Sequence, residues 1–140
     1  MNSMESHITL ENRMEELGRM PAWLEELGEA WGLPAASMLS FNVALEEAVS
    51  NIILYGYDDP GTHQIELQAT LQDGVLRFVL RDDGHEFDPT RRPPPDLNLP
   101  AEERPIGGLG IYMIHKIMDR VEYHRINSYN HLILTKNTGT

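Results

Sequence analysis

Glu47 and Asn51 lie four residues apart in the segment EAVSN, and their types suit metal-assisted proton transfer. Residues at this spacing share one face of a helix. The asparagine side chain offers a neutral carbonyl oxygen of the kind that Mg2+ binds, and the glutamate can act as a general base. A solvated helix face that also carries Glu46 and Ser50 is the simpler interpretation of this segment alone.

The second candidate is the segment DDGHEFDP, which covers residues 82–89. Its first acid, Asp82, has the same parity as Leu76, Phe78 and Leu80, so a strand would direct its carboxylate to the covered face of a sheet. An ionised carboxylate accepts hydrogen bonds from donors such as the exocyclic amine of adenine, and Gly84 allows close approach of the backbone. A polar turn that merely ends a strand is the alternative, because Asp-Gly is common in turns. The parity of Asp82 weakens that alternative.

The third candidate is the segment GGLG at residues 107–110, directly before a run with helical spacing. Backbone amides at a helix start, together with the helix dipole, bind anions such as phosphate. The segment is not a dinucleotide-binding fingerprint, because a proline-rich loop precedes it and Met113 stands where the last glycine belongs. The Gly-Lys-Ser/Thr of a Walker loop does not occur. Taken alone, the segment fits a phosphate cradle and a flexible loop exit equally well.

The N-terminal half supplies the helix that must carry the first candidate. Residues 6–12 predict a short strand with Ile8 and Leu10 on one face. Apolar residues at helical spacing predict a helix over residues 14–31, which Pro21 and Gly28 can interrupt. A second helix is expected from a cap at Ser37 to about Tyr55.

The C-terminal half predicts a sheet and a long loop. Alternating side chains over residues 63–82 predict a hairpin that turns at Asp73-Gly74. A loop with six prolines between residues 89 and 105 excludes a helix interior and a central strand, and a loop of that kind is typical of a lid or a disordered segment.

After this loop, the sequence predicts a third helix and a closing hairpin. The hairpin is expected to run over residues 121–126 and 131–136 and to turn at 127–130. The order of elements favours an α+β fold with helices gathered on one face of an antiparallel-rich sheet. The apolar stripe of the third helix is expected to consist of Ile111, Ile114, Met118 and Val121.

Length, charge and composition narrow the possible functions. A chain of 140 residues with 41% hydrophobic side chains is expected to form one domain over residues 1–140. Eleven basic and twenty-two acidic side chains give a formal charge of −11, which disfavours direct binding to nucleic acid or anionic membranes. The chain has no cysteine, so disulfides and thiolate chemistry are excluded. It shows neither a signal-peptide pattern nor an apolar run near the ~20 residues of a membrane helix, which predicts a soluble cytoplasmic protein.

The order of the three candidate segments resembles the nucleotide-binding boxes of the GHKL ATPase superfamily. EEAVSNIILYGY, RDDGHEFDP and ERPIGGLGIYMI are most similar to the segments of bacterial anti-sigma-factor serine-protein kinases. The resemblance covers about residues 40 to 136. It implies a Bergerat fold, which is a two-layer α/β sandwich with a mixed, mostly antiparallel sheet, helices on one face and a lid at about residues 88–106.

The resemblance also implies ATP and Mg2+ as cofactors and assigns roles to the residues of the boxes. Asn51 would hold Mg2+, and Glu47 would be the base that activates a substrate serine. Asp82 would bind the adenine amine, and Gly84 would leave room for the adenine ring. The other implied nucleotide contacts are Phe87, Arg104, Gly107, Gly108, Leu109, Gly110 and Ile111, with Arg91 and Arg92 as alternatives to Arg104 and Thr135 as a candidate polar residue near adenine.

The function implied by the resemblance is that of a protein serine kinase that works by partner switching. Such a kinase would form a homodimer, hold a sigma factor or another output protein inactive, and phosphorylate a serine of a STAS-type antagonist. A module that binds ATP to shape a protein-binding surface, and transfers nothing, is the alternative. Glu47 favours the kinase, because a pure binder need not keep an acid there. A detached catalytic half of a histidine kinase is disfavoured by the lack of a phosphoacceptor helix hairpin.

Overall fold

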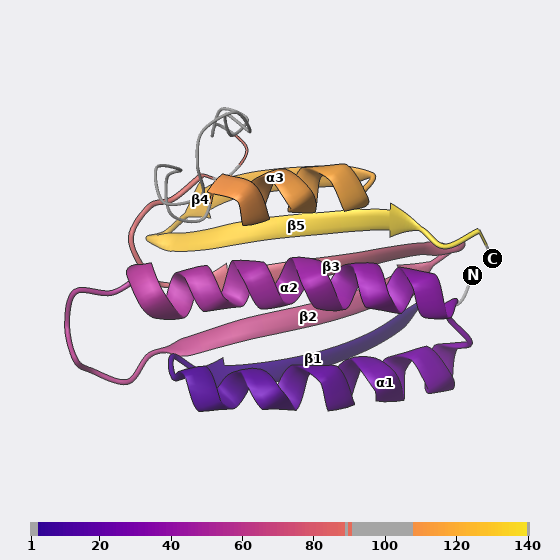
Figure 1. The fold of residues 1–140 in the computed structure, drawn as a ribbon, viewed down its shortest axis with the longest axis horizontal. Helices are drawn as coiled ribbons and strands as arrows, with labels where there is room; N and C mark the ends of the chain where they lie inside the picture. Colours follow the sequence, from indigo (N-terminus) through magenta and orange to yellow (C-terminus); the bar gives the residue numbers. More distant parts are fainter. Residues whose placement is uncertain (1–2, 89, 91–107, 140) are drawn as a thin grey trace.

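A five-stranded sheet with α-helices packed on one face makes up the part of the chain that the computed structural model describes, residues 3–88, 90 and 108–139 (Figure 1). The strand order is β1-β2-β3-β5-β4. The strands are β1 (Met4–Glu11), β2 (Gln64–Gln72), β3 (Val75–Asp82), β4 (Arg120–Ile126) and β5 (Tyr129–Asn137). The helices are the 3-10 turn η1 (Met14–Gly18), α1 (Arg19–Trp31), α2 (Ala35–Tyr55) and α3 (Gly108–Ile117).

All four strand pairings are antiparallel. The expected α+β fold is thus confirmed, but the expectation of a mixed sheet was wrong. Two helices, α1 and α2, run in opposite directions between β1 and β2 and bring the chain back to the end where β1 finished (Figure 1). An even number of such passes makes β2 antiparallel to β1, and tight hairpins do the same for the β2–β3 and β4–β5 pairs.

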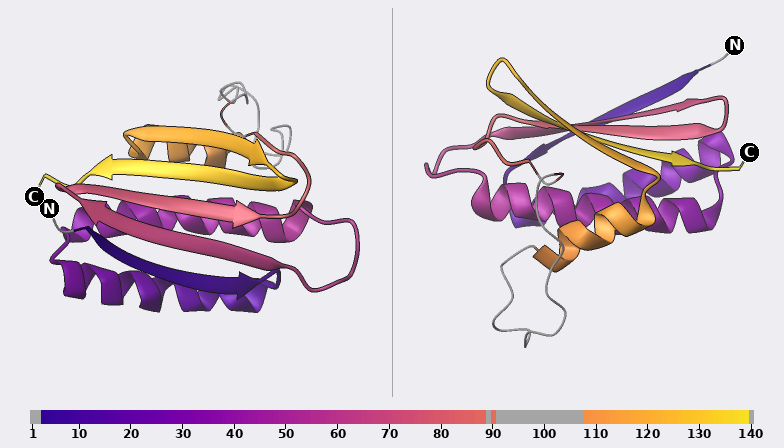
Figure 2. Two further views of the ribbon diagram at one scale, coloured as in Figure 1. Left: turned by 180° about the vertical axis from the view of Figure 1, so that it is seen from behind. Right: turned by 90° about the horizontal axis from the view of Figure 1, so that it is seen from above.

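Alternation along the strands separates the two faces of the sheet, as the sequence predicts. The helices cover one face and leave the other open (Figure 2). Phe78 on β3 lies at the centre of the covered face, with ring centroids 5.7 Å from Trp23 and 4.6 Å from Phe41. Burial of these aromatic rings joins α1 and α2 to the sheet. The face of α2 that carries Glu47 and Asn51 is therefore held in one fixed orientation.

The first two helices differ from their expected boundaries. The single helix expected over residues 14–31 is divided into η1 and α1. The cap predicted at Ser37 was wrong, because α2 begins at Ala35 directly after Pro34, whose backbone is extended with φ −61° and ψ 138°. Proline is tolerated at the start of a helix because its missing N–H removes no intrahelical hydrogen bond there. Ser37 is buried within the first turns of α2 instead.

The two hairpins turn on residues with positive φ. The first turns at Asp73 (φ 53°) and Gly74 (φ 77°), as predicted. The second turns at Asn127 (φ 52°) and Ser128 (φ 69°) and is shorter than the predicted four residues. As a consequence, Asn130 belongs to β5 rather than to the turn, which becomes important for the functional site.

The third helix is shorter than its predicted apolar stripe. Met118 is buried and its N–H donates to Ile114 O at 3.1 Å, just beyond the end of α3. Asp119 N donates to Thr135 O, so pairing with β5 has already begun there, and Val121 lies in β4. No helix in the described part of the chain is long and apolar enough to span a membrane.

Candidate functional site

A cavity of about 360 Å3 lies between α2, α3 and the ends of β3 and β5. The second half of α2, the first residues after β3 and the start of β5 all contribute to its wall. Its polar lining includes Asn51, Asp82 and Asn130. Its apolar wall includes Ala48, Ile52, Leu80, Ile114 and Leu132. A volume of this size and a mostly apolar wall with a few convergent polar groups are typical of small-molecule sites.

Asp82 is a buried acid at the floor of this cavity. It is 4% exposed, which confirms the direction that strand parity predicts. Its Oδ1 accepts hydrogen bonds from Gly84 N at 2.9 Å and from Asn130 Nδ2 at 3.0 Å. Burial raises the pKa of Asp82 against the lowering effect of these hydrogen bonds. Within the described residues no donor contacts Oδ2, so this oxygen can accept a hydrogen bond from a ligand.

Asn130 is the central polar residue of the site, and the sequence analysis missed it. It is 5% exposed and its Nδ2 also donates to His85 O at 2.7 Å. Arg125 Nη1 donates to Asn130 Oδ1 at 3.0 Å and to Gly84 O at 2.8 Å. The hydroxyl of Tyr123 donates to the same Asn130 oxygen. A turn placed at residues 127–128 would have put Asn130 in the strand. Its parity with Leu132 and Leu134 would then have predicted that it faces the helices.

Thr135, the candidate polar residue near adenine, does not line the cavity. It pairs with Arg77 on β3 and with Arg120 on β4, one position along from the buried Leu134. Alternation therefore places it on the open face of the sheet. Asn130, in register with Asp82, is the polar residue of β5 that lines the cavity.

Gly84 brings the segment after β3 into contact with the end of α2. The His85 N–H donates to Gly56 O at 2.9 Å. A Cβ on Gly84 would lie 2.7 Å from that same carbonyl oxygen, so a side chain would force the two segments apart. This backbone contact is therefore sufficient to require glycine at position 84.

Glu47 and Asn51 lie on one face of α2, as their spacing predicts. Asn51 Nδ2 donates to Glu47 Oε1 at 3.2 Å, and both residues are half-buried. Asn51 lines the cavity and Glu47, one turn earlier, does not. The hydrogen bond from Nδ2 orients the amide and leaves its carbonyl oxygen available.

The remaining predicted contacts fall into two groups. Phe87 lines the cavity and is 38% exposed. The backbone of α3 begins at Gly108 and continues through Leu109, Gly110 and Ile111, and Ile114 in its second turn lines the cavity. Outside the described residues lie Arg91, Arg92, Arg104, Gly107 and all of the expected lid except residues 88 and 90.

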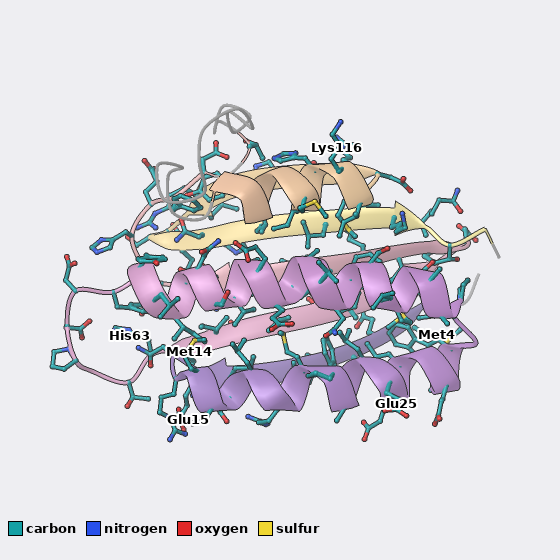
Figure 3. The ribbon with its side chains drawn as sticks, viewed as in Figure 1. Met4, Met14, Glu15, Glu25, His63 and Lys116 are labelled. Atoms are coloured by element: carbon teal, nitrogen blue, oxygen red, sulfur yellow. The ribbon has the colours of Figure 1, made fainter. Side chains whose placement is uncertain are left out.

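His63 lies in the loop between α2 and β2 (Figure 3). It bridges Asp59 of that loop to Asp83, just after β3. Its Nε2 lies 2.9 Å from Asp59 Oδ1 and its Nδ1 lies 3.3 Å from Asp83. Its ring stacks on Tyr57 with centroids 4.2 Å apart. The hydrogen bond to Asp59, followed by the one to Asp83, raises the pKa of His63. No local pattern in the sequence predicts this bridge beside Asp82.

Comparison with known proteins places these features in context. Residues 10–136 match the family described as "Histidine kinase-like ATPase domain". Serine/threonine-protein kinase BtrW of Bordetella bronchiseptica is 25% identical over 119 residues, which cover 84% of this chain and 82% of that protein. The anti-sigma F factor of Oceanobacillus iheyensis is 30% identical over 88 residues, which cover 61% of this chain and 58% of that protein.

A solved structure shares the fold. The crystal structure of the RsbU and RsbW domains of Rv1364c from Mycobacterium tuberculosis superposes with a TM-score of 0.68 at 20% identity. The superposition covers 96% of this chain and 32% of the other. At this level of identity, the likeness shows a common fold.

Proposed function

Because the chain belongs to the histidine kinase-like ATPase family, we propose that it binds ATP and transfers the γ-phosphoryl group to a serine of another protein. The observation that carries this proposal is the convergence of Asn51, Asp82 and α3 on one cavity. These are the three separate segments that the sequence analysis singled out. The names of its relatives, a serine/threonine-protein kinase and an anti-sigma factor, support the same activity.

In this proposal, adenine lies against the apolar wall and its exocyclic amine donates to Asp82. The carboxylate is buried and offers Oδ2 as an acceptor, so a donor on the base matches it. Phe87 closes the cavity on the side of the segment after β3. Gly84 keeps that segment close to α2. The adenine ring would occupy the cavity that these two segments border.

Asn51 is the residue that would hold Mg2+. Its Nδ2 is engaged by Glu47, so the carbonyl oxygen is the free end of the amide. Mg2+ is commonly held by one or two protein oxygens while phosphates and water supply the rest, and one amide oxygen beside a nucleotide site fits that pattern. When bound, the ion would neutralise phosphate charge.

Glu47 is the proposed general base. It would take the proton of the substrate serine as the hydroxyl oxygen attacks the γ-phosphorus and the bond to the β–γ bridging oxygen breaks, so that ADP leaves. Its hydrogen bond with Asn51 places the carboxylate next to the residue proposed to bind the metal. The amides of Gly107, Gly108, Leu109, Gly110 and Ile111 would cradle the phosphates, with Arg104, or else Arg91 or Arg92, as the cationic contact of a lid at about residues 88–106.

At the level of the cell, we propose partner switching in a bacterial cytoplasm by a single domain over residues 1–140. A homodimer would hold a sigma factor or another output protein. It would release that protein when it binds a STAS-type antagonist instead. Phosphorylation of the antagonist's serine would reverse the exchange. The alternative is an ATP-gated binding module, and the hydrogen bond that already engages Glu47 is compatible with such a purely structural role.

The experiment compares wild type with Glu47→Gln and with the neighbouring exposed Glu46→Gln as the matched control. Each protein is incubated with labelled Mg-ATP and a panel of STAS-type antagonists, and ATP binding and serine phosphorylation are followed in the same samples. Transfer by wild type and Glu46→Gln, with binding but no transfer in Glu47→Gln, supports the kinase and its base. Binding without transfer by all three would favour the binding module, and failure of wild type to bind ATP would remove the proposal.

A further inference from the structure

Asp82, Asn130 and Arg125 occupy neighbouring positions on three adjacent strands. Asp82 on β3 is in register with Asn130 on β5, and Asn130 is in register with Arg125 on β4. The three side chains form one hydrogen-bonded row across the end of the sheet. Only the first two line the cavity. Arg125 therefore acts on the cavity through its neighbours.

The hydrogen bonds of this row define the orientation of the Asn130 amide. Its nitrogen donates to Asp82 Oδ1 at 3.0 Å and to His85 O at 2.7 Å. Its oxygen accepts from Arg125 Nη1 at 3.0 Å and from the Tyr123 hydroxyl. Reversal of the amide would place donor against donor at the Arg125 end and acceptor against acceptor at the Asp82 end. Arg125 thus keeps the nitrogen of Asn130 directed at Asp82.

The same arrangement gives the two carboxylate oxygens of Asp82 different hydrogen-bond partners. Gly84 N and Asn130 Nδ2 both donate to Oδ1. Asp82 lines the cavity, no donor of the described residues contacts its Oδ2, and this oxygen is an acceptor only, as long as the carboxylate is ionised. The positive charge of Arg125 favours that ionised form against burial. An exocyclic amine on a purine matches Oδ2, whereas an exocyclic carbonyl would oppose one acceptor with another.

We propose that Arg125 and Asn130 are positioning residues that make Asp82 select amino-purines over oxo-purines at this site. The inference rests on the proposed binding of ATP and goes beyond it by assigning the choice of base to a row of three strands. A site that hydrogen-bonds a ligand group discriminates strongly against an analogue without it, because its buried polar atoms are left unpaired. Arg125, which lies outside the cavity wall, would support this discrimination because it fixes the orientation of the Asn130 amide.

A purely structural role for Arg125 has a different signature. Arg125 also donates to Gly84 O at 2.8 Å, so its loss could loosen the segment after β3 and weaken every nucleotide equally. The informative quantity is therefore the ratio of two dissociation constants and not either one alone. ATP and purine riboside triphosphate form the best pair, because they differ only in the exocyclic amine.

The experiment measures this ratio by calorimetry for wild type, Arg125→Met, Arg125→Lys and the control Arg120→Met, which changes an exposed arginine at the other end of β4. In Arg125→Met the preference for ATP should shrink roughly tenfold, the equivalent of one well-placed hydrogen bond. Arg125→Lys should recover part of it, and Arg120→Met should leave it unchanged. An equal loss for both nucleotides in Arg125→Met would overturn the positioning role.

Asp82→Asn tests the orientation independently. Because Gly84 N and Asn130 Nδ2 both need an acceptor, the new amide should direct its oxygen to them and its nitrogen to the ligand. The variant should then bind ITP, which carries an exocyclic carbonyl, more tightly than ATP, the reverse of wild type. A folded variant that still prefers ATP, or that binds neither, would contradict the inference. Failure of wild type itself to bind ATP would instead refute the proposed function.

Discussion

Asn130 donates a hydrogen bond of 3.0 Å to Oδ1 of Asp82, across a separation of 48 residues in the chain. One residue begins the helix-facing side of β5 and the other ends that of β3. Both are almost fully buried. A buried carboxylate needs hydrogen-bond donors to remain ionised, and the pairing of these two strands provides one. The acceptor that a nucleotide base would meet is therefore a product of strand register.

Asp82→Asn should stabilise the protein even as it changes nucleotide binding. Burial raises the pKa of Asp82 in the folded state, so the folded protein retains a proton that the unfolded chain has lost. The free energy of unfolding consequently falls as pH rises from the unfolded to the folded pKa of this acid. The variant lacks this loss, and its advantage over wild type should grow from acid to neutral pH.

Urea unfolding of both proteins across that pH range measures the effect. Glu25→Gln, which changes an exposed acid on α1, is a suitable control. If the difference in the free energy of unfolding between variant and wild type is the same at every pH, the charge of Asp82 costs nothing in the folded protein.

His63→Gln should likewise reduce the loss of stability that accompanies rising pH. The pKa of His63 is raised by Asp59 and Asp83 above its usual value of 6.5. A raised histidine pKa contributes stability that is fully present below the unfolded pKa and is lost as pH rises through the folded pKa. Wild type should therefore lose more stability than the variant between mildly acidic and mildly alkaline pH.

Thermal unfolding midpoints of wild type, His63→Gln and the exposed control His124→Gln would test this. The control should follow wild type. Parallel curves for wild type and His63→Gln would mean that the bridge between the loop after α2 and β3 contributes no proton-linked stability.

Gly84→Ala should lower the free energy of unfolding by about 1–3 kcal/mol, the usual cost of adding a carbon atom to a tightly packed site. Its Cβ would lie 2.7 Å from Gly56 O, which already accepts the His85 N–H. The matched control is Gly18→Ala, because a Cβ there meets no atom within 4 Å. Denaturant titration of the two variants should separate them clearly. Equal stability would mean that the segment after β3 can move away from α2 at no cost.

Ser128→Gly should stabilise the hairpin that places Asn130. Ser128 has φ 69°, a left-handed conformation that costs a residue with a side chain about 1 kcal/mol or more. Asn-Gly is the preferred pair for a two-residue turn of this kind. The variant should gain up to about 1 kcal/mol in urea unfolding, whereas Ser128→Ala should gain nothing. A loss of stability in Ser128→Gly would contradict the assigned turn.

Local patterns in the sequence were sufficient for much of the fold and for part of the site. Alternation along residues 76–82 predicts that Asp82 faces the helices, and helical spacing predicts that Glu47 and Asn51 share a face; both are confirmed. The turn at Asp73-Gly74 is confirmed as well. Each of these properties follows from backbone periodicity or from the conformation of adjacent residues, so it is encoded within a few positions of the chain.

Only the tertiary structure determined which distant residues meet. A predicted turn that was two residues too long hid Asn130, because a strand's contacts depend on its register and not on its composition. The same is true of Arg125, which reaches the site through Asn130, and of Gly84, whose constraint comes from the carbonyl of Gly56. Long-range packing against the helices sets that register. The chemistry of each side chain was therefore readable from the sequence, whereas its partners were decided by the assembled sheet.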